Sequence, residues 1–291
     1  MQDQLPVLVH SPGSGGIDRQ WFDKVIVAND MAYDLTDFAE RNPEVADVWM
    51  DASREYCTYD GKLLVKPAAV TRPIGLYYNE TMYQPETSIG DLSFDEFLDD
   101  LGDNKIALMT GENAWTTGLL LSAIIANEEG GAEFLNAYTD EKLYDYTDEL
   151  LVNAFDKLQD VFANYASANA VGAAYAEAAN AFMSKAAAVI CNGSWMAGDF
   201  TEESTDKWSN GFTGDDVKAD IYPGNVAIGS QSTFGEFWIS NQASDEEKEL
   251  AEAFLAFRDS QDELERFMLA EGGVAPNLDY SDEFIEAQKE T

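Results

Sequence analysis

Short blocks of apolar and polar positions follow one another along this chain, and they predict helices and strands in mixed order. The segment 93–101 begins with Ser93-x-x-Glu96, a capping-box pattern, and continues with apolar residues at helical spacing, which predicts a helix. Further along, a run of Ala, Val and Ile at 186–191 is closed by Asn192 and Gly193, and this length and composition predict a buried strand. Helices mixed with such strands indicate an α/β protein.

The middle of the chain contains further segments with helical periodicity. Apolar residues recur at three- and four-residue spacing in 116–127 and 147–165, so each is predicted to be a helix with one face in a core. The Ala-rich segment 175–185 is a strong helix former. One face of that helix would carry Tyr175, Ala178, Ala179 and Phe182.

The last third of the chain predicts two more helices. The first begins with the capping-box pattern Ser244-x-x-Glu247, and the second covers 258–269 and ends at Gly272. The first helix has one apolar row, formed by Leu250, Ala253, Phe254 and Phe257. We expect this row to lie in a core.

Tryptophans follow two of the predicted strands. In open α/β sheets ligands lie outside the carboxyl ends of strands, and Trp195 comes directly after the strand at 186–191. A shorter strand is predicted at 106–109, and the loop after it carries Asn113 and Trp115. An indole ring can lie flat on the apolar face of a sugar ring, but it can also cap a core, and the pattern alone leaves both interpretations open.

Several segments, taken in order, resemble one known family. They are Tyr59–Pro67 with Ile74–Tyr83, Ser93–Leu98, Glu112–Leu120, Phe182–Trp195, Phe234–Ser240 with Glu246–Phe257, and Gly272–Pro276. Their content and order are similar to those of the extracellular solute-binding proteins of ABC sugar importers, the family 1 group that resembles maltose-binding protein. The similarity covers roughly residues 5–280.

This resemblance implies an α/β, two-lobed periplasmic-binding-protein-like fold of type II. In that fold each lobe is a mixed sheet flanked by helices, and the ligand cleft lies between the lobes. Residues 1–73 and 236–275 would form the first lobe, 74–235 the second lobe, and 276–291 a C-terminal segment near the hinge. Compared with the family's usual pattern, we expect a chain shortened at both ends, whose first lobe lacks its N-terminal strand, helix and strand.

The resemblance also implies a function. We expect an extracytoplasmic protein, a cell-surface lipoprotein or a periplasmic protein, that binds a sugar or oligosaccharide reversibly by lobe closure and works with the permease subunits of an ABC transporter. No enzymatic activity and no cofactor is implied. Export rests on the resemblance, because Met1–Pro6 lacks the basic and apolar regions of a signal peptide.

Ligand-contacting residues are carried over onto the matching positions. They are Trp195, Trp115, Asn113, Glu236, Thr71, Arg72, His10, Ser11 and Ser14. The aromatic residues would stack on a sugar ring while amide, carboxylate and guanidinium groups bind its hydroxyls. Two interpretations without a ligand contact stay open. In one, Arg72 forms a surface ion pair; in the other, the glycine-rich loop after His10 serves only to begin a helix near 17–24.

The charge of the chain is strongly acidic. It has 55 acidic and 17 basic residues and a formal net charge of -38 at pH 7. Such a charge repels the phosphates of nucleic acids and favours a soluble monomer. Carboxylates cluster at 99–100, 215–216 and 245–247, but without the spacing of a calcium-binding EF-hand loop. Cation binding remains an alternative to an adaptation to a salty or acidic niche.

Residues that could carry covalent chemistry are few. Cys57 and Cys191 have no metal-type spacing, so we expect two unpaired, buried thiols. His10 is the single histidine, and no nucleophile motif accompanies it. Two alternatives stay open: a glycoside-processing enzyme with paired carboxylates, and a truncated relative that acts as an interaction module.

Overall fold

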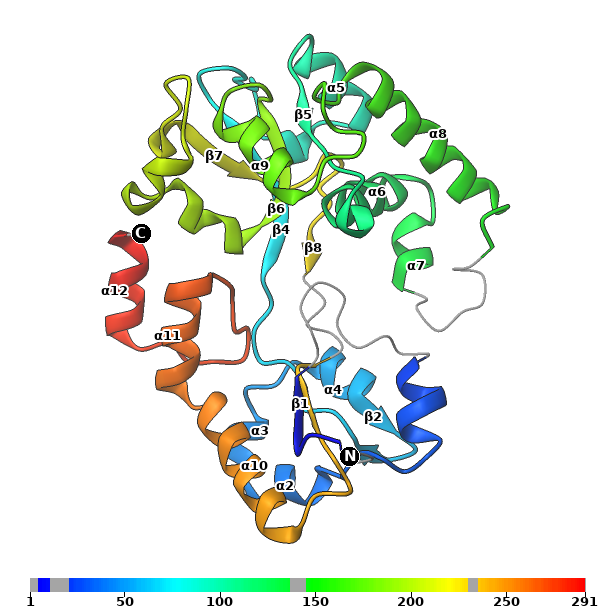
Figure 1. The fold of residues 1–291 in the computed structure, drawn as a ribbon, viewed down its shortest axis with the longest axis vertical. Helices are drawn as coiled ribbons and strands as arrows, with labels where there is room; N and C mark the ends of the chain where they lie inside the picture. The colour runs from blue at the N-terminus through cyan, green and yellow to red at the C-terminus, as the bar shows by residue number, and fades with distance from the viewer. Residues whose placement is uncertain (1–4, 11–20, 137–144, 230–234, 291) are drawn as a thin grey trace. The chain divides into compact units, whose positions relative to one another are not determined.

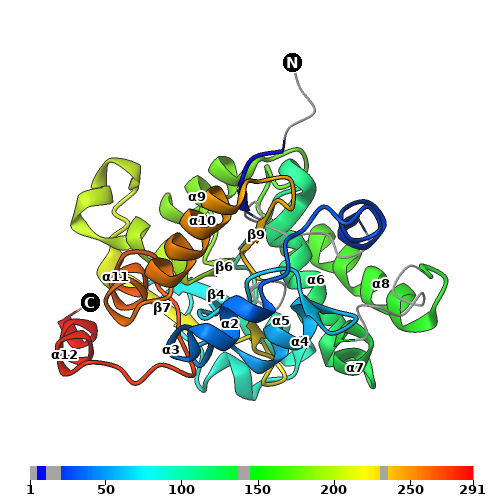
Figure 2. The same ribbon diagram turned by 90° about the horizontal axis from the view of Figure 1, so that it is seen from below.

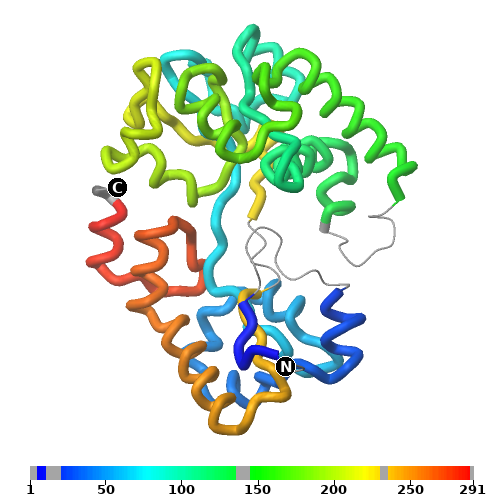
Figure 3. The backbone as a smooth tube through the Cα atoms, in the orientation of Figure 1, coloured from blue at the N-terminus to red at the C-terminus, as the bar shows by residue number. Residues whose placement is uncertain are grey.

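The protein forms two compact units. The computed structural model describes residues 5–10, 21–136, 145–229 and 235–290 (Figure 1). Unit 1 consists of Met1–Arg72 with Gly229–Thr291, and unit 2 consists of Pro73–Ile228. The chain therefore crosses between the units after Arg72 and after Ile228, where the sequence analysis placed the crossings after residues 73 and 235. The colour sequence in Figure 3 follows this path from unit 1 into unit 2 and back.

Unit 2 is built on a five-stranded mixed sheet. Its strands are β4 (Pro73–Asn79), β5 (Ile106–Ala107), β6 (Val189–Gly193), β7 (Val217–Asp220) and β8 (Ile228–Gly229). The order is β5-β6-β4-β7, and β8 also pairs with β4. β4 runs antiparallel to β6 and β7, whereas β5 and β6 are parallel. Every residue of β6 is buried, so the buried strand predicted from the Ala, Val and Ile run is confirmed, beginning at Val189.

Helices cover both faces of this sheet (Figure 1). They are α5 (Phe94–Leu101), α6 (Trp115–Asn127), α7 (Gly131–Asn136), α8 (Glu149–Asn164) and α9 (Tyr175–Met183). Unit 2 also contains short 3₁₀ helices, among them η3 (Ile89–Asp91), η6 (Ser194–Phe200), η7 (Glu202–Lys207) and η8 (Gly214–Asp216). Leu76 and Cys191 pack with α5, α6 and α8, while Ile190 packs with Phe182 of α9 on the other face. The sheet is therefore the centre of a three-layered core.

The capping box predicted for α5 is present. The Ser93 hydroxyl accepts a hydrogen bond from the Glu96 amide at 3.2 Å, and the Glu96 carboxylate accepts one from the Ser93 amide at 2.8 Å. The expected packing residues of this helix, Phe94, Phe97, Leu98 and Leu101, are all buried. Local sequence chemistry thus predicted both the start and the buried face of α5.

Unit 1 joins the two ends of the chain. Its elements are β1 (Leu8–His10), a π-helical turn η2 (Phe22–Val27), α2 (Thr36–Arg41), α3 (Pro43–Ala46), α4 (Asp51–Cys57), β2 (Thr58–Tyr59), β3 (Lys62–Leu63), β9 (Phe237–Ile239), α10 (Asp245–Arg258), α11 (Gln261–Glu271) and α12 (Asp282–Glu290). β1 pairs antiparallel with β9, and β2 with β3. Helices α10, α11 and α12 follow one another, each contacting the next (Figure 2). The Trp238 ring of β9 packs edge-on against Phe22, 5.9 Å between centroids.

The apolar row predicted to bury α10 is exposed, so that prediction is wrong. Leu250, Phe254 and Phe257 are 73%, 40% and 56% exposed, and Ala253 is exposed as well. The buried face is formed instead by Ala251 and Leu255. Both rows have helical spacing. The exposed row is longer and more aromatic, so the sequence pattern favoured it as the buried face. Periodicity alone does not tell which of two apolar rows a core covers.

Neither cysteine takes part in a disulfide bond, and both are buried, as expected. Cys57 lies at the end of α4 in unit 1, and Cys191 lies in β6 of unit 2. Burial raises the pKa of the Cys191 thiol to about 12, so the reactive thiolate is scarce at neutral pH. Cys191 therefore behaves as a small core residue.

Candidate functional site

Three aromatic rings from three separate segments of the chain gather in unit 2. Trp115 is the first residue of α6, Tyr175 the first residue of α9, and Trp195 follows the end of β6. The ring centroids of Trp115 and Tyr175 are 5.1 Å apart, and those of Trp115 and Trp195 are 6.1 Å apart. All three side chains are partly exposed. We call Trp115, Tyr175 and Trp195 the aromatic platform.

Gly193 allows the Trp195 ring to lie against the end of β6. A Cβ atom at position 193 would stand 2.2 Å from the Trp195 ring, far inside van der Waals contact. The Gly193 backbone is extended, with φ -111, so the glycine is required for close approach rather than for an unusual backbone conformation. The Gly193 carbonyl accepts a hydrogen bond from the Tyr77 hydroxyl at 3.2 Å.

Asn192 links the platform to the sheet. Its side chain is 1% exposed, and its amide nitrogen donates to the Tyr175 hydroxyl oxygen at 3.1 Å. Its carbonyl oxygen accepts a hydrogen bond from the Gly193 amide at 2.9 Å. Burial raises the pKa of Tyr175, so this phenol is neutral at physiological pH. The buried amide thus fixes the orientation of one platform ring.

A cavity of about 460 Å³ lies at the end of the sheet, where β4 begins and β6 and β7 end, and two residues that contact the platform, Asn192 and Gly193, line it. Its lining residues are Pro73, Ile74, Gly75, Leu76, Tyr77, Asn192, Gly193, Ser194, Ala219, Asp220 and Ile221. A cavity of this size suits a small organic molecule. The Ser194 hydroxyl is buried and has no hydrogen-bond partner among the described residues.

The lining of this cavity is largely neutral. Its one carboxylate, that of Asp220, already accepts hydrogen bonds from the Ser88 hydroxyl and from the amides of Ile89 and Ile221. Burial raises the pKa of the Tyr77 phenol to about 12, which keeps this group uncharged. The site therefore offers apolar surface with neutral donors and acceptors.

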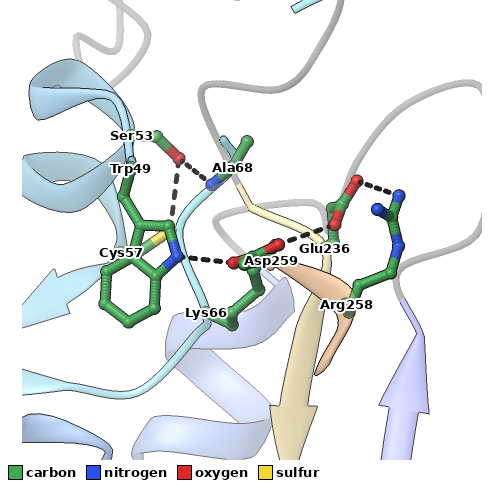
Figure 4. Close-up of polar contacts among 8 residues, drawn as sticks. All are labelled: Trp49, Ser53, Cys57, Lys66, Ala68, Glu236, Arg258 and Asp259. Atoms are coloured by element: carbon green, nitrogen blue, oxygen red, sulfur yellow. Dashed lines mark hydrogen bonds and ion pairs between the residues drawn. The ribbon is translucent and has the colours of Figure 1, made fainter. Parts of the chain in front are cut away.

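In unit 1, the predicted ligand residue Glu236 belongs to a buried network of charges (Figure 4). The fully buried Lys66 ammonium lies 2.9 Å from one Glu236 oxygen and 2.8 Å from Asp259. The Trp49 indole donates to Asp259 at 2.6 Å, and Arg258 lies 3.7 Å from the second Glu236 oxygen. Figure 4 shows that these side chains converge from separate segments of unit 1.

The network sets the protonation of its members. Burial raises the pKa of Glu236, but the positive charges of Lys66 and Arg258 outweigh it and lower the pKa to about 2. Burial lowers the pKa of Lys66, and the carboxylates of Asp259 and Glu236 more than restore it. For Asp259, burial dominates and raises the pKa. The Glu236 carboxylate is therefore ionised and engaged within the protein.

The other predicted residues of unit 1 are placed as follows. The exposed His10 ring packs on Phe237, with centroids 4.7 Å apart, and the charge of His10 contributes to the low pKa of Glu236. Thr71 pairs through its backbone with Val274, and Arg72 lies 3.8 Å from Glu271. Ser11 and Ser14 lie outside the described residues, as does the first half of the helix expected near 17–24, whereas Phe22 to Lys24 belong to the π-helical turn η2.

The structure thus brings together two of the sequence-derived candidates in each unit. Trp115 and Trp195 meet in unit 2, with exposed Asn113 beside Trp115, while His10 and Glu236 lie close in unit 1. Sequence reasoning missed Tyr175 and Asn192 as members of the site. Tyr175 fits the apolar face of α9, and Asn192 precedes a glycine as in an ordinary turn, so neither pattern signalled this role.

The described residues contain neither a membrane-spanning helix nor a cluster of metal-ligating side chains. None of the helices in these parts of the chain combines the length and the apolar character that a membrane crossing requires. Within the same residues, no three or more His, Cys, Asp or Glu side chains come together as a metal site. The acidic clusters at 99–100, 215–216 and 245–247 thus form no such group.

The chain belongs to the family of bacterial extracellular solute-binding proteins, whose sequence profile matches residues 11–290. The resemblance inferred from the sequence motifs is confirmed, and so is the two-lobed periplasmic-binding-protein-like fold class. The protein is therefore a solute-binding protein of an extracellular type. No curated protein matches the chain.

Solved structures share the fold at low sequence identity. A chitin oligosaccharide binding protein has a TM-score of 0.69 at 18% identity, over 98% of this chain and 72% of that chain. A Streptococcus pneumoniae solute-binding protein in complex with the blood group A-trisaccharide has a TM-score of 0.71 at 18% identity, over 94% and 66%. Maltose-bound MalE3 of T. maritima has a TM-score of 0.66 at 16% identity, over 98% and 70%. This chain thus spans about two thirds of the pneumococcal protein's length.

Proposed function

We propose that this protein binds a neutral sugar or oligosaccharide reversibly and serves as the binding component of an ABC importer. The observation that carries the proposal is the aromatic platform beside a cavity lined by apolar surface and neutral polar groups. Membership in the extracellular solute-binding family supports the role of a binding component, and the chemistry of the site supports the class of solute.

The chemistry of a sugar matches this site. A pyranose has apolar C–H faces, which stack on aromatic rings, and a rim of hydroxyls, which need hydrogen-bond partners. Trp115, Tyr175 and Trp195 would provide the stacking surface, while the exposed Asn113 would bind hydroxyls. The neutral lining favours an uncharged ligand over an acidic one, because desolvating a carboxylate without a positive partner is costly.

The comparisons support the same ligand class. Three solved structures with this fold are of a chitin oligosaccharide binding protein, a protein in complex with a blood group A-trisaccharide and a maltose-bound protein. In our proposal, ligand binding shifts the equilibrium between open and closed arrangements of the two units, and the permease recognises the closed form. No covalent bond is made or broken. The protein would act at the cell surface as a lipoprotein or in the periplasm.

In this proposal unit 1 supplies further ligand contacts. The residues carried over from the family pattern are His10, Ser11, Ser14, Thr71, Arg72 and Glu236. The engagement of Glu236 with Lys66 and Arg258 leaves it the least available of these, so we assign it an indirect role.

Calorimetric titration with neutral oligosaccharides tests the proposal. Maltotriose, chitotriose, xylotriose and raffinose are the probes, with glucuronic acid as the charged comparison. We expect heat of binding with one neutral class, and its loss in Trp195→Ala. The matched control is Trp208→Ala, because Trp208 packs on Phe212 in unit 2 and takes no part in the platform.

The same samples are incubated with nitrophenyl glycosides to detect hydrolysis. Release of nitrophenol would show an enzyme instead of a binding protein. A folded wild-type protein that binds none of the neutral probes, or a Trp195→Ala variant that binds as well as wild type, would contradict the proposal.

A further inference from the structure

An unusual turn leads into the aromatic platform. Glu112, Asn113 and Ala114 have φ values of 48°, 61° and 52°, so three consecutive residues other than glycine adopt the left-handed conformation. L-residues adopt this conformation rarely and singly, because Cβ crowds the neighbouring carbonyl. Trp115, the first residue of α6, follows immediately. The turn therefore sets the direction in which the Trp115 ring leaves the backbone.

Hydrogen bonds join the turn to the segment that precedes α9. The Gly111 amide donates to the Ala173 carbonyl at 2.8 Å, and the Gly172 amide donates to the Thr110 hydroxyl at 2.7 Å. A Cβ atom at position 111 would lie 2.8 Å from the same Ala173 carbonyl oxygen, so a larger residue would separate the two segments. Segments 110–115 and 172–175 thus form one connected structure.

The carboxylate of Glu112 completes this connection. It accepts a hydrogen bond from the Tyr175 amide at 3.0 Å, at the N-terminus of α9. The first amides of a helix have no partner within the helix, and a negative charge there is favoured by the helix dipole. One side chain therefore joins the left-handed turn before Trp115 to the backbone of Tyr175, and the rings of these two residues lie 5.1 Å apart.

We propose that Glu112 is a positioning residue, which holds the left-handed turn in place and thereby keeps Trp115 against Tyr175 and Trp195. It acts through the platform and does not touch the ligand. A left-handed turn without this bond would relax toward ordinary backbone angles and move the Trp115 ring. The consequence for binding rests on the proposed function, whereas the consequence for the ring geometry does not.

Three variants test the proposal: Glu112→Ala, Glu112→Gln and Glu177→Ala. Glutamine keeps an oxygen that accepts the Tyr175 amide, so it should act as the conservative rescue. Glu177 is the matched control, because its carboxylate accepts from the Ala174 amide at 2.8 Å at the same helix N-terminus but makes no bond to the turn. Each alanine variant thus removes one carboxylate–amide bond from the start of α9.

The informative readout is the near-ultraviolet circular dichroism of the tryptophans, measured well below the unfolding midpoint. A Trp115→Phe variant identifies the part of the spectrum that arises from the platform. We expect Glu112→Ala to lose this part and to bind the preferred oligosaccharide about tenfold more weakly or worse, as expected for misplaced contact groups. Glu112→Gln should retain both properties. Glu177→Ala should lower the unfolding midpoint and change neither.

Each result decides one point. An unchanged platform spectrum in Glu112→Ala, or an equal loss in Glu177→Ala, would overturn the positioning role. A lost spectrum in Glu112→Ala, together with a wild-type protein that binds no sugar, would support the positioning role and contradict the proposed function. If Glu112→Ala does not fold, the double variant Glu112→Ala/Ala114→Gly replaces it, since glycine adopts the left-handed conformation without strain. The same spectral criterion then applies.

Discussion

The charge network around Glu236 makes one prediction that can be worked out in numbers. The perturbation is Glu236→Gln, which removes the negative charge but keeps the shape and an oxygen that can accept from Lys66. In the folded protein the pKa of Glu236 lies at about 2, against 4.5 as the ordinary value, because Lys66 and Arg258 outweigh the effect of burial. The Glu236 side chain is 24% exposed, so solvent screens these interactions only in part.

The magnitude follows from the linkage between pKa and stability. The difference between 4.5 and about 2, at about 1.4 kcal/mol for each pH unit, corresponds to about 3 kcal/mol. A carboxyl group with a lowered pKa stabilises the folded state above its unfolded pKa, and this contribution disappears as pH falls through the folded value. The stabilisation is therefore complete above about pH 5 and is lost between pH 4.5 and 2.

Urea unfolding of wild type and Glu236→Gln at a series of pH values measures this effect. We expect the variant to be less stable by about 3 kcal/mol at pH 7, and the difference to shrink toward zero between pH 4.5 and 2. A difference below about 1 kcal/mol at pH 7, within the range of an exposed ion pair, would refute the reasoning. A difference that stays constant with pH would also refute it, since the effect would then not arise from the charge.

Two further predictions concern packing. Gly193→Ala should displace the Trp195 ring, because the added Cβ would stand 2.2 Å from it. We expect this variant to bind sugar more weakly in a calorimetric titration. The control Gly198→Ala should bind as wild type does, because nothing lies within 4 Å of its new atom. Leu255→Ala should lower the free energy of unfolding in urea by about 2–5 kcal/mol, because Leu255 is fully buried. Leu250→Ala should lower it by less than about 0.5 kcal/mol, because Leu250 is 73% exposed. Binding by Gly193→Ala at wild-type affinity, or equal losses of stability at 255 and 250, would contradict these expectations.

Elements with strong local signals could be predicted from the sequence. The Ser93 capping box requires only residues three positions apart, and β6 is bounded by its own composition and by Asn192 and Gly193. The position of Trp195 after a buried strand was predicted in the same way. These features depend on residues close together in the sequence, so local sequence patterns are enough to predict them.

Features that depend on distant partners could not be predicted. Which of the two apolar rows of α10 is buried depends on what packs against the helix, and periodicity does not encode that. Glu236 is engaged by Lys66, 170 residues earlier in the chain, and no local pattern announces a buried lysine. Tyr175 joins the site through Asn192, which lies in β6, and through the turn at Glu112. The left-handed turn itself has no glycine to signal it.

The pairing of β1 with β9 has a consequence for the order of folding. Unit 2 is one continuous stretch of chain, Pro73–Ile228, whereas unit 1 needs Leu8 to pair with Ile239 and Phe22 to pack on Trp238. During synthesis from the N-terminus, unit 2 can therefore fold before the last strand of unit 1 has been made. The N-terminal strand β1 of unit 1 has no partner strand until β9 has been synthesised. Contacts this far apart in sequence also form slowly, so we expect unit 1 to be completed after unit 2.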